Sequence, residues 1–273
     1  RCAAAPCGKI AWGKRRRQRS RTPTRRAGVI ATLPMYDRRE MRAATDGLWQ
    51  AIRTTLGYGP AQLTRRDDPW PLWQDPNLLL GQTCGLPYRT QLAKYVKYVG
   101  TPDYGLEGCP PGYYASVFIA RQDAILSDFQ NKTFAYNEPL SQSGWAGPID
   151  HLCRRTIRPR RCLRSGSHQN SARYVAEGRA DFAAIDSQSW RLIKAYDPWA
   201  KNLFEIGQSD PTPGLPMICA QNFHADELAQ ACTQAISSLP ESTRETLGLK
   251  GFVDLSAAAY FALPDPVDIA DFC

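Results

Sequence analysis

Short apolar runs alternate with amphipathic stretches along the chain from Val29 onward. A short apolar run rich in β-branched residues predicts a buried strand, whereas apolar residues about three or four positions apart predict a helix with one buried face. By these patterns we expect strands over residues 29–33, 77–81, 95–99, 113–120, 133–137, 182–186, 203–207 and 215–220. We expect helices over residues 40–56, 171–178, 187–196, 225–239 and 256–263, and a further helix that starts at residues 141–144.

The alternation of strands and helices is typical of the α/β class. The order of the elements further predicts two α/β lobes joined by a two-strand hinge. Residues 29–115 would begin the first lobe, residues 116–204 would form the second, and residues 205–273 would return to the first. A hinge between two lobes places a ligand cleft between them. Periodicity alone fixes the α/β class, and the inserted lobe is an inference from the order of the elements.

The composition is that of a globular protein, with 273 residues of which 43% are hydrophobic and 22% charged. No stretch approaches the ~20 apolar residues that span a bilayer, so we expect no membrane insertion. We also find no Walker loop, no G-x-S-x-G elbow and no H-E-x-x-H motif. We therefore expect no catalytic residue and no cofactor.

The net charge of +8 is concentrated at the start of the chain, where residues 1–28 carry ten basic side chains and no acidic one. The remaining residues therefore carry a net charge of −2. A dense run of like charges with little apolar surface is expected to be a disordered arm. We favour an unstructured leader or a non-native extension over a tether for nucleic acid or an anionic membrane, so no specific nucleic-acid partner is expected. The arm lacks the apolar core of a signal peptide.

The nine cysteines include no C-x-x-C pair, and only three histidines accompany them, so no metal site is expected. Cys84 and Cys109 each lie in a loop rich in glycine or proline. They are the best candidates for a disulfide, which would favour an oxidising compartment. Because the sequence cannot fix cysteine connectivity, the alternative of free thiols at both positions stays open.

The segment Ser141-Gln142-Ser143-Gly144 places two hydroxyl groups where a strand ends and a helix starts. The first N–H groups of a helix lack internal partners and the helix dipole is positive there, so hydroxyl and N–H donors together can bind an anion. Gly144 would let a ligand approach the backbone closely. The alternative is an ordinary serine N-cap, which this pattern alone favours.

Three further side chains follow predicted strands or open predicted helices. His168 can donate an N–H to an anion, or it can cap a helix or face solvent. Asp186 ends a buried strand, where it can face a ligand crevice or cap the next helix. Tyr36 follows the first strand at the same kind of crevice edge.

Over about residues 29–221 the chain resembles the phosphate, phosphite and phosphonate-binding proteins of ABC importers, which are type II periplasmic binding proteins. The segment Ser141–Gly144 is similar to the Ser-Thr-Ser-Gly anion loop of that family, and residues 166–168 and 175–181 add to the likeness. Gln142 departs from the family pattern because it replaces a hydroxyl residue. The resemblance implies that Ser141, Gln142, Ser143 and His168 hold the oxyanion with help from Tyr36, and that Tyr88 or Thr83 and Asp186 contact the rest of the ligand.

The resemblance also implies a function without catalysis. The protein would be a monomeric, periplasmic solute-binding protein that delivers a phosphonate, phosphite or phosphate to an ABC permease. A cytoplasmic location stays open, because no signal peptide is recognised. One alternative keeps the fold and changes the ligand to a sulfonate or a thiamine-precursor pyrimidine. A more distant alternative is an enzyme, or a nucleic-acid-binding protein that uses the basic arm.

Overall fold

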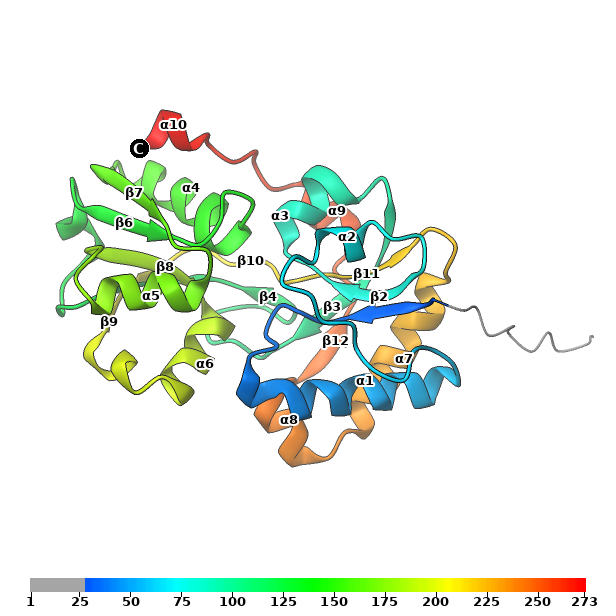
Figure 1. The fold of residues 1–273 in the computed structure, drawn as a ribbon. Helices are drawn as coiled ribbons and strands as arrows, with labels where there is room; N and C mark the ends of the chain where they lie inside the picture. Colours follow the sequence, from blue (N-terminus) through cyan, green and yellow to red (C-terminus); the bar gives the residue numbers. More distant parts are fainter. Residues whose placement is uncertain (1–27) are drawn as a thin grey trace, which may run out of the picture.

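Two five-stranded sheets organise the chain in a computed structural model that describes residues 28–273 (Figure 1). The expectations for the basic arm fall on residues 1–27 and lie outside the described residues. The strands are β1 (Ile30–Thr32), β2 (Leu78–Gln82), β3 (Val96–Asp103), β4 (Tyr113–Tyr114), β5 (Ser116–Ala120), β6 (Thr133–Tyr136), β7 (Arg161–Arg164), β8 (Phe182–Asp186), β9 (Phe204–Gln208), β10 (Thr212–Pro213), β11 (Met217–Ala220) and β12 (Gly251–Val253).

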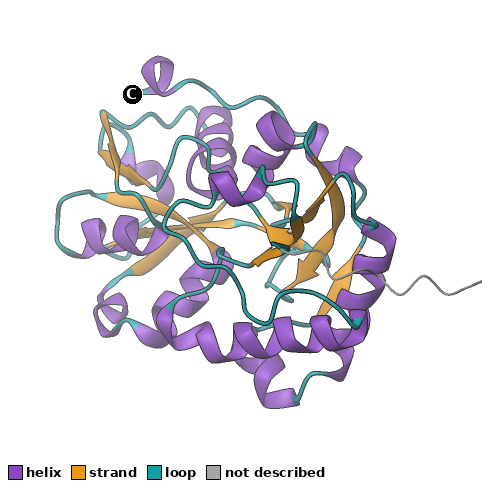
Figure 2. Cartoon of the chain, turned by 45° about the vertical axis from the view of Figure 1, so that its right-hand side comes forward, coloured by secondary structure: helices purple, strands orange, loops and turns teal. Residues whose placement is uncertain are grey.

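Helices surround both sheets, as Figure 2 shows. They are α1 (Arg42–Leu56), α2 (Trp70–Trp73), α3 (Gly85–Pro87), α4 (Gly147–Arg154), α5 (His168–Ala176), α6 (Ser187–Tyr196), α7 (Ala225–Ser238), α8 (Glu241–Leu247), α9 (Ala257–Phe261) and α10 (Ile269–Phe272). Shorter helical turns are η1 (Arg39–Met41), η2 (Tyr88–Leu92), η3 (Leu126–Phe129), η4 (Gln142–Ala146) and η5 (Pro198–Asn202). In the part of the chain that the structure covers, no helix has both the length and the apolar character needed to cross a membrane.

The first lobe is built on the sheet with strand order β1-β2-β11-β3-β12, in which β1 and β2 are parallel and β11 and β12 pair antiparallel with their neighbours. Helix α1 buries Trp49 and Ile52 in its core. The helix ends at Gly57, whose φ of 77° is the left-handed conformation that glycine adopts readily.

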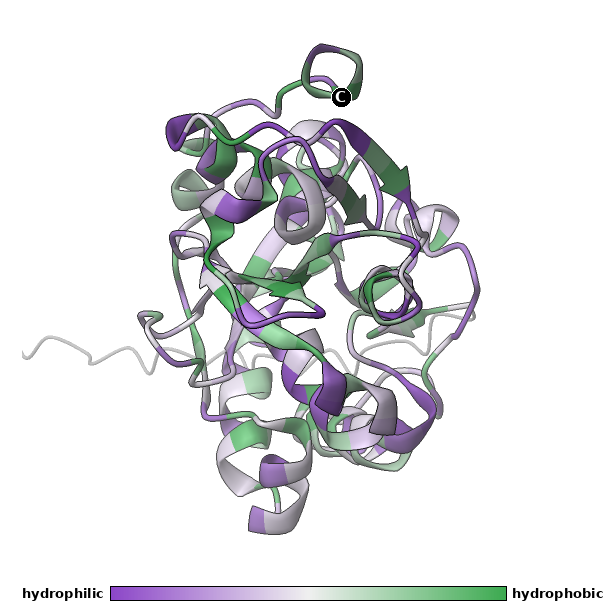
Figure 3. Cartoon of the chain, turned by 90° about the vertical axis from the view of Figure 1, so that its left-hand side faces the viewer, coloured by the Kyte–Doolittle hydropathy of each residue, from purple (hydrophilic) through white to green (hydrophobic). Residues whose placement is uncertain are grey.

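The second lobe is built on the sheet with strand order β7-β6-β8-β5-β9. Along β8 the side chains alternate between its two faces, because Phe182 and Ala184 pack in one apolar cluster and Ala183 and Ile185 in another. Both faces of the strand are thus buried, which explains its continuous apolar run. In Figure 3 the interior strands are mainly hydrophobic, and the hydrophilic positions lie mainly on outer loops and helix faces.

The strands β4 and β10 connect the two lobes and pair antiparallel as a two-stranded hinge. Strand β9 still belongs to the second sheet, and Phe272 near the C-terminus packs in a core cluster of the second lobe. The structure therefore differs from the predicted return to the first lobe at residue 205, since residues 204–208 and 269–273 lie on the second lobe. Apolar periodicity shows that a segment is buried, but it does not show against which sheet.

The predicted disulfide between Cys84 and Cys109 is not formed, because both residues are free cysteines. Among the described residues, a disulfide joins Cys162 on β7 to Cys273, over a sequence separation of 111 residues. Spacing along the sequence does not reveal such a distant contact. Among the described residues, no group of histidine, cysteine, aspartate and glutamate side chains could hold a metal ion.

Candidate binding site

A cleft of about 860 Å³ lies between the two lobes. The first lobe contributes the loop after β1 and the segment around Trp70, and the second lobe contributes the starts of η4, α5 and α6. Of the predicted site residues, those that line the cleft are Tyr36, Ser141, Ser143, His168 and Asp186.

The anion loop Ser141–Gly144 opens the turn η4 at the end of β6. Ser141 is the N-cap, and its Oγ accepts a hydrogen bond of 2.9 Å from the backbone N–H of Gly144. The N-cap alternative is therefore correct for this residue. A hydroxyl that accepts at its oxygen still has its own O–H to donate, so Ser141 can cap the helix and bind an anion at the same time.

Gly144 is needed for packing inside the protein. A Cβ atom at this position would lie 1.7 Å from Oδ1 of Asn137, far closer than any real contact. The close approach of Asn137 is therefore a packing reason for glycine at this position, and the close approach of a ligand to Gly144 stays a prediction. Asn137 itself lines the cleft, and so the packing holds the anion loop against the cleft wall.

Ser143 and His168 bring the two predicted donor segments together. Oγ of Ser143 lies 3.0 Å from Nε2 of His168, the first residue of α5. Ser167 caps this helix through a 3.1 Å hydrogen bond from the N–H of Asn170, which is why the helix begins earlier than predicted. Burial lowers the pKa of His168 to about 4, against a smaller opposing effect of the Ala184 carbonyl. His168 is therefore neutral near pH 7 and offers a dipole instead of a charge.

Tyr36 and Asp186 join the two lobes inside the cleft. The hydroxyl of Tyr36 donates a 2.8 Å hydrogen bond to Oδ2 of Asp186, and Oδ1 accepts one of 2.7 Å from the N–H of Ser189. Asp186 therefore caps α6 and also faces the cleft. Burial raises the pKa of Asp186 to about 6, although these hydrogen bonds to its carboxylate act in the opposite direction.

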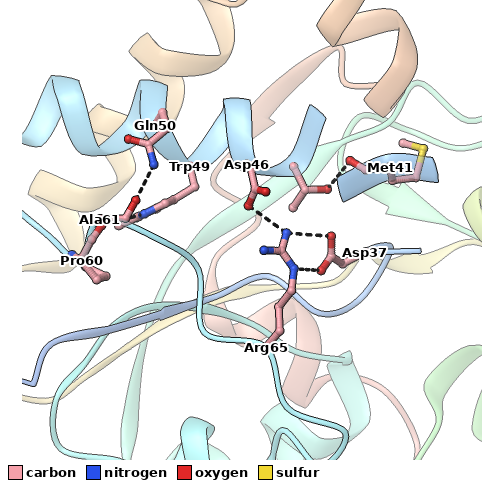
Figure 4. A network of polar contacts seen from close by, with 9 residues as sticks. Asp37, Met41, Asp46, Trp49, Gln50, Pro60, Ala61 and Arg65 are labelled. Carbon is pink, nitrogen blue, oxygen red and sulfur yellow. Dashed lines mark hydrogen bonds and ion pairs between the residues drawn. The ribbon is translucent and has the colours of Figure 1, made fainter. Parts of the chain in front are cut away.

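An ion-pair network fixes the loop that carries Tyr36 (Figure 4). The guanidinium of Arg65 binds Asp37 and also binds Asp46 of α1, at 2.9 Å in the latter case. The next residue of the loop, Arg38, reaches the second lobe and pairs with Asp197 at 2.9 Å. Asp37 therefore holds the loop after β1 to the first lobe, and Tyr36 and Arg38 on either side of it contact the second lobe.

Both arginines that line the cleft are engaged in ion pairs. Arg38 pairs with Asp197 and with Glu40, and Arg164 pairs with Glu138. Donors that stay available for an anion include the hydroxyl group of Ser141 and, when the imidazole N–H of His168 donates to Ser143, the hydroxyl group of Ser143. Hydrogen-bond dipoles would therefore stabilise an anion here, as they do at helix N-termini.

Four predicted ligand contacts do not line the cleft. Thr83 is fully buried and its N–H bonds the Pro216 carbonyl, and Tyr88 packs in an aromatic cluster of the first lobe. Gln142 has a buried side chain, and Gly144 packs under Asn137. Residue type does not separate the two environments, because a tyrosine or threonine after a buried strand fits a core as well as a cleft. Ligand contact by these four residues stays a prediction.

Sequence reasoning missed the role of Cys84, whose Sγ lies in the cleft wall and accepts from the N–H of Gln142 at 3.3 Å. It also missed Asn137 and Arg38, although Asn137 shortly precedes Ser141 and Arg38 shortly follows Tyr36. The only available signal was this adjacency, because asparagine and arginine are ordinary surface residues.

Residues 90–260 match a protein family described as "ABC transporter, phosphonate, periplasmic substrate-binding protein". No curated protein matches the sequence. Among solved structures, the chain is similar to PhnD1 from Prochlorococcus marinus in complex with methylphosphonate, with a TM-score of 0.67 and 15% identity over 85% of this chain and 94% of that one.

Two further structures support the same comparison. A binding protein component of an ABC phosphonate transporter from Pseudomonas aeruginosa has a TM-score of 0.66 and 17% identity, and covers 85% of this chain and 83% of that one. A Xanthomonas citri protein bound to chloride ion has a TM-score of 0.62 and 14% identity, over 86% of this chain and 94% of that one. These likenesses confirm the predicted fold of two α/β lobes.

Proposed function

This chain belongs to the family of periplasmic phosphonate substrate-binding proteins of ABC transporters, and we propose that it closes its two lobes on a small phosphorus oxyanion. The preferred ligand is a phosphonate, with phosphite and phosphate as close relatives. In this proposal the protein works in the periplasm as a monomer, has no catalytic role, and hands its ligand to an ABC permease.

The observation that carries the proposal is the meeting of Ser141, Ser143 and His168 at one point of the interlobe cleft. Each hydrogen bond to a charged group contributes ~1.5–3 kcal/mol. Four or five such bonds are enough for micromolar affinity after the costs of ordering the ligand and the lobes. Tyr36 lines the same cleft from the first lobe.

The contacts between the lobes support a clamp that closes on its ligand. Tyr36 reaches Asp186, and Arg38 reaches both Asp197 and the Leu192 carbonyl of the second lobe. Each contact joins elements that rotation about the hinge would separate. Ligand and interlobe contacts would therefore stabilise the same closed form.

The organic part of the ligand would face the remainder of the cleft. Asp186, Asp67 and Asp68 line it, together with Trp70. A sulfonate is the second candidate, because neutral donors and nearby carboxylates suit an anion of low charge. The pyrimidine alternative has no comparable support from the cleft residues.

Thermal stability tests the proposal directly, because only a true ligand stabilises the folded protein by mass action. We expect Tm to rise by several degrees with at least one of phosphate, phosphite, methylphosphonate and 2-aminoethylphosphonate. Sulfate and short sulfonates serve as comparison ligands. A rise with sulfonates alone would select the second candidate, and no rise with any of them would reject the oxyanion site.

A further inference from the structure

The C-terminal segment 262–273, called the strap below, crosses from the first lobe to the second (Figure 1). It starts after α9, whose buried Tyr260 donates to the Gly214 carbonyl beside the hinge strand β10. It ends at α10, and the disulfide Cys162–Cys273 fixes its last residue to β7. The strap is therefore a third covalent connection between the lobes.

On the first lobe, Arg89 holds the strap. Its side chain is only 4% exposed, and its guanidinium donates to the carbonyls of Leu263 and Pro264 at 3.3 and 2.6 Å. It also pairs with Asp265 at 3.5 Å. A buried cation is costly without acceptors, so the strap completes the environment of Arg89 as well as being held by it.

On the second lobe, the strap contacts Trp145, the residue that follows the anion loop. The indole N–H of Trp145 donates a 2.9 Å hydrogen bond to the Val267 carbonyl, and the indole is 1% exposed. The ring of Phe272 packs edge-on against Trp145 at 6.1 Å. The strap thus touches η4, the turn that contains Gln142, Ser143 and Gly144 of the anion loop.

Only Pro266 separates the residues held by Arg89 from the residue held by Trp145. Two residue steps span at most ~7 Å, so the strap has little slack between the lobes. We propose that the disulfide-anchored strap positions the anion loop and limits how far the lobes open. Breaking the Cys162–Cys273 bond should then weaken ligand binding and widen the cleft. The binding part rests on the proposed function, whereas the limit on opening does not.

The first test uses methylphosphonate and compares the oxidised protein with the reduced protein and with the Cys162→Ser/Cys273→Ser variant. We expect Kd to rise about tenfold on reduction, mainly through faster dissociation, and the double variant to be weak and insensitive to reductant. Cys153→Ser is the matched control, since Cys153 is a free thiol beside the same core cluster. Trp145→Phe, which keeps a ring and removes the donor, should reproduce part of the loss.

The second test needs no ligand. Small-angle scattering of the full chain should give a larger radius of gyration after reduction, and Cys153→Ser should not change it. Should the oxidised protein not bind methylphosphonate, the comparison uses whichever of phosphate, phosphite and 2-aminoethylphosphonate raises its Tm. Should it bind none of them, the proposed function is rejected and the scattering decides on the strap. Thiol titration verifies that the disulfide is broken in the reduced protein. A Kd of the reduced protein within twofold of the oxidised value would then overturn the positioning role. An unchanged radius of gyration would overturn the limit on opening.

Discussion

Replacing Arg38 with methionine should weaken ligand binding although Arg38 is already engaged by protein groups. Its guanidinium donates to Asp197 at 2.9 Å and to the Leu192 carbonyl at 3.3 Å, and it lies 5.1 Å from the ring centroid of Tyr196. All three groups belong to the second lobe, whereas Arg38 belongs to the first. Methionine keeps most of the apolar stem and removes only the charged head.

The burial of the pair sets the expected size of the effect. A hydrogen bond to a charged group contributes ~1.5–3 kcal/mol, and an exposed ion pair ~0.2–1 kcal/mol. The side chains of Arg38 and Asp197 are 19% and 10% exposed. We therefore assign the contact about 1.5 kcal/mol. If this contact breaks when the lobes open, removing it destabilises only the closed form that binds the ligand. Kd should therefore rise about tenfold.

The assay is a calorimetric titration of methylphosphonate into the wild type, Arg38→Met, Asp197→Asn and the double variant. The two single losses should not add, because both remove the same contact. Glu40→Gln is the control, since Glu40 also pairs with Arg38 but lies on the same lobe. Single variants that bind within twofold of the wild type, or losses that add fully, would refute the interlobe role.

Two further substitutions test the local chemistry of the site. Gly144→Ala should cost ~1–3 kcal/mol of stability by overpacking and should weaken phosphonate binding, as measured by urea unfolding and titration. Adding Asn137→Ala should restore part of the stability and part of the phosphonate binding. Gly251→Ala, at an open position, should change neither the stability nor the binding. Burial raises the pKa of Asp186 in the folded protein to about 6, from 3.8. The unfolded chain therefore ionises first, and the stability that Asp186 contributes below about pH 4 is lost as pH rises through about 6. Asp186→Asn should therefore gain on the order of 3 kcal/mol relative to wild type between pH 4 and 7, and a difference that does not change with pH would contradict the raised pKa.

Strands buried on both faces were predictable almost to the residue. Strand β8 was expected at residues 182–186 and is found there, and β2 is displaced from its prediction by one residue. The edge strand β7 was missed because arginines stand at both of its ends, where an edge strand meets solvent. β7 forms a strand because it pairs with β6, and the sequence of one strand does not show which other strand it pairs with.

The helical start at Ser141–Gly144 was predictable because the segment follows a buried strand and opens with Ser141, a residue that caps helices, whereas its binding of an anion stays a prediction. The meeting of Ser143 with His168 depends on the parallel pairing of β6 with β7, the strands that precede these two residues. Only the family resemblance implied that the two side chains act together. The contacts made by Asn137, Arg38 and Cys273 depend on tertiary packing between distant segments. Local patterns carry no information about such contacts, and so these residues were missed.

The most direct test of the central claim is a calorimetric titration of phosphonates into the purified wild type and the Ser143→Ala/His168→Ala variant. We expect a phosphonate to bind the wild type with one site and micromolar or tighter affinity. The variant should keep its fold, as judged by Tm without ligand, and lose at least tenfold in affinity. Equal affinity in both proteins would contradict an oxyanion site at Ser143 and His168, and no binding to the wild type would contradict the proposed function itself.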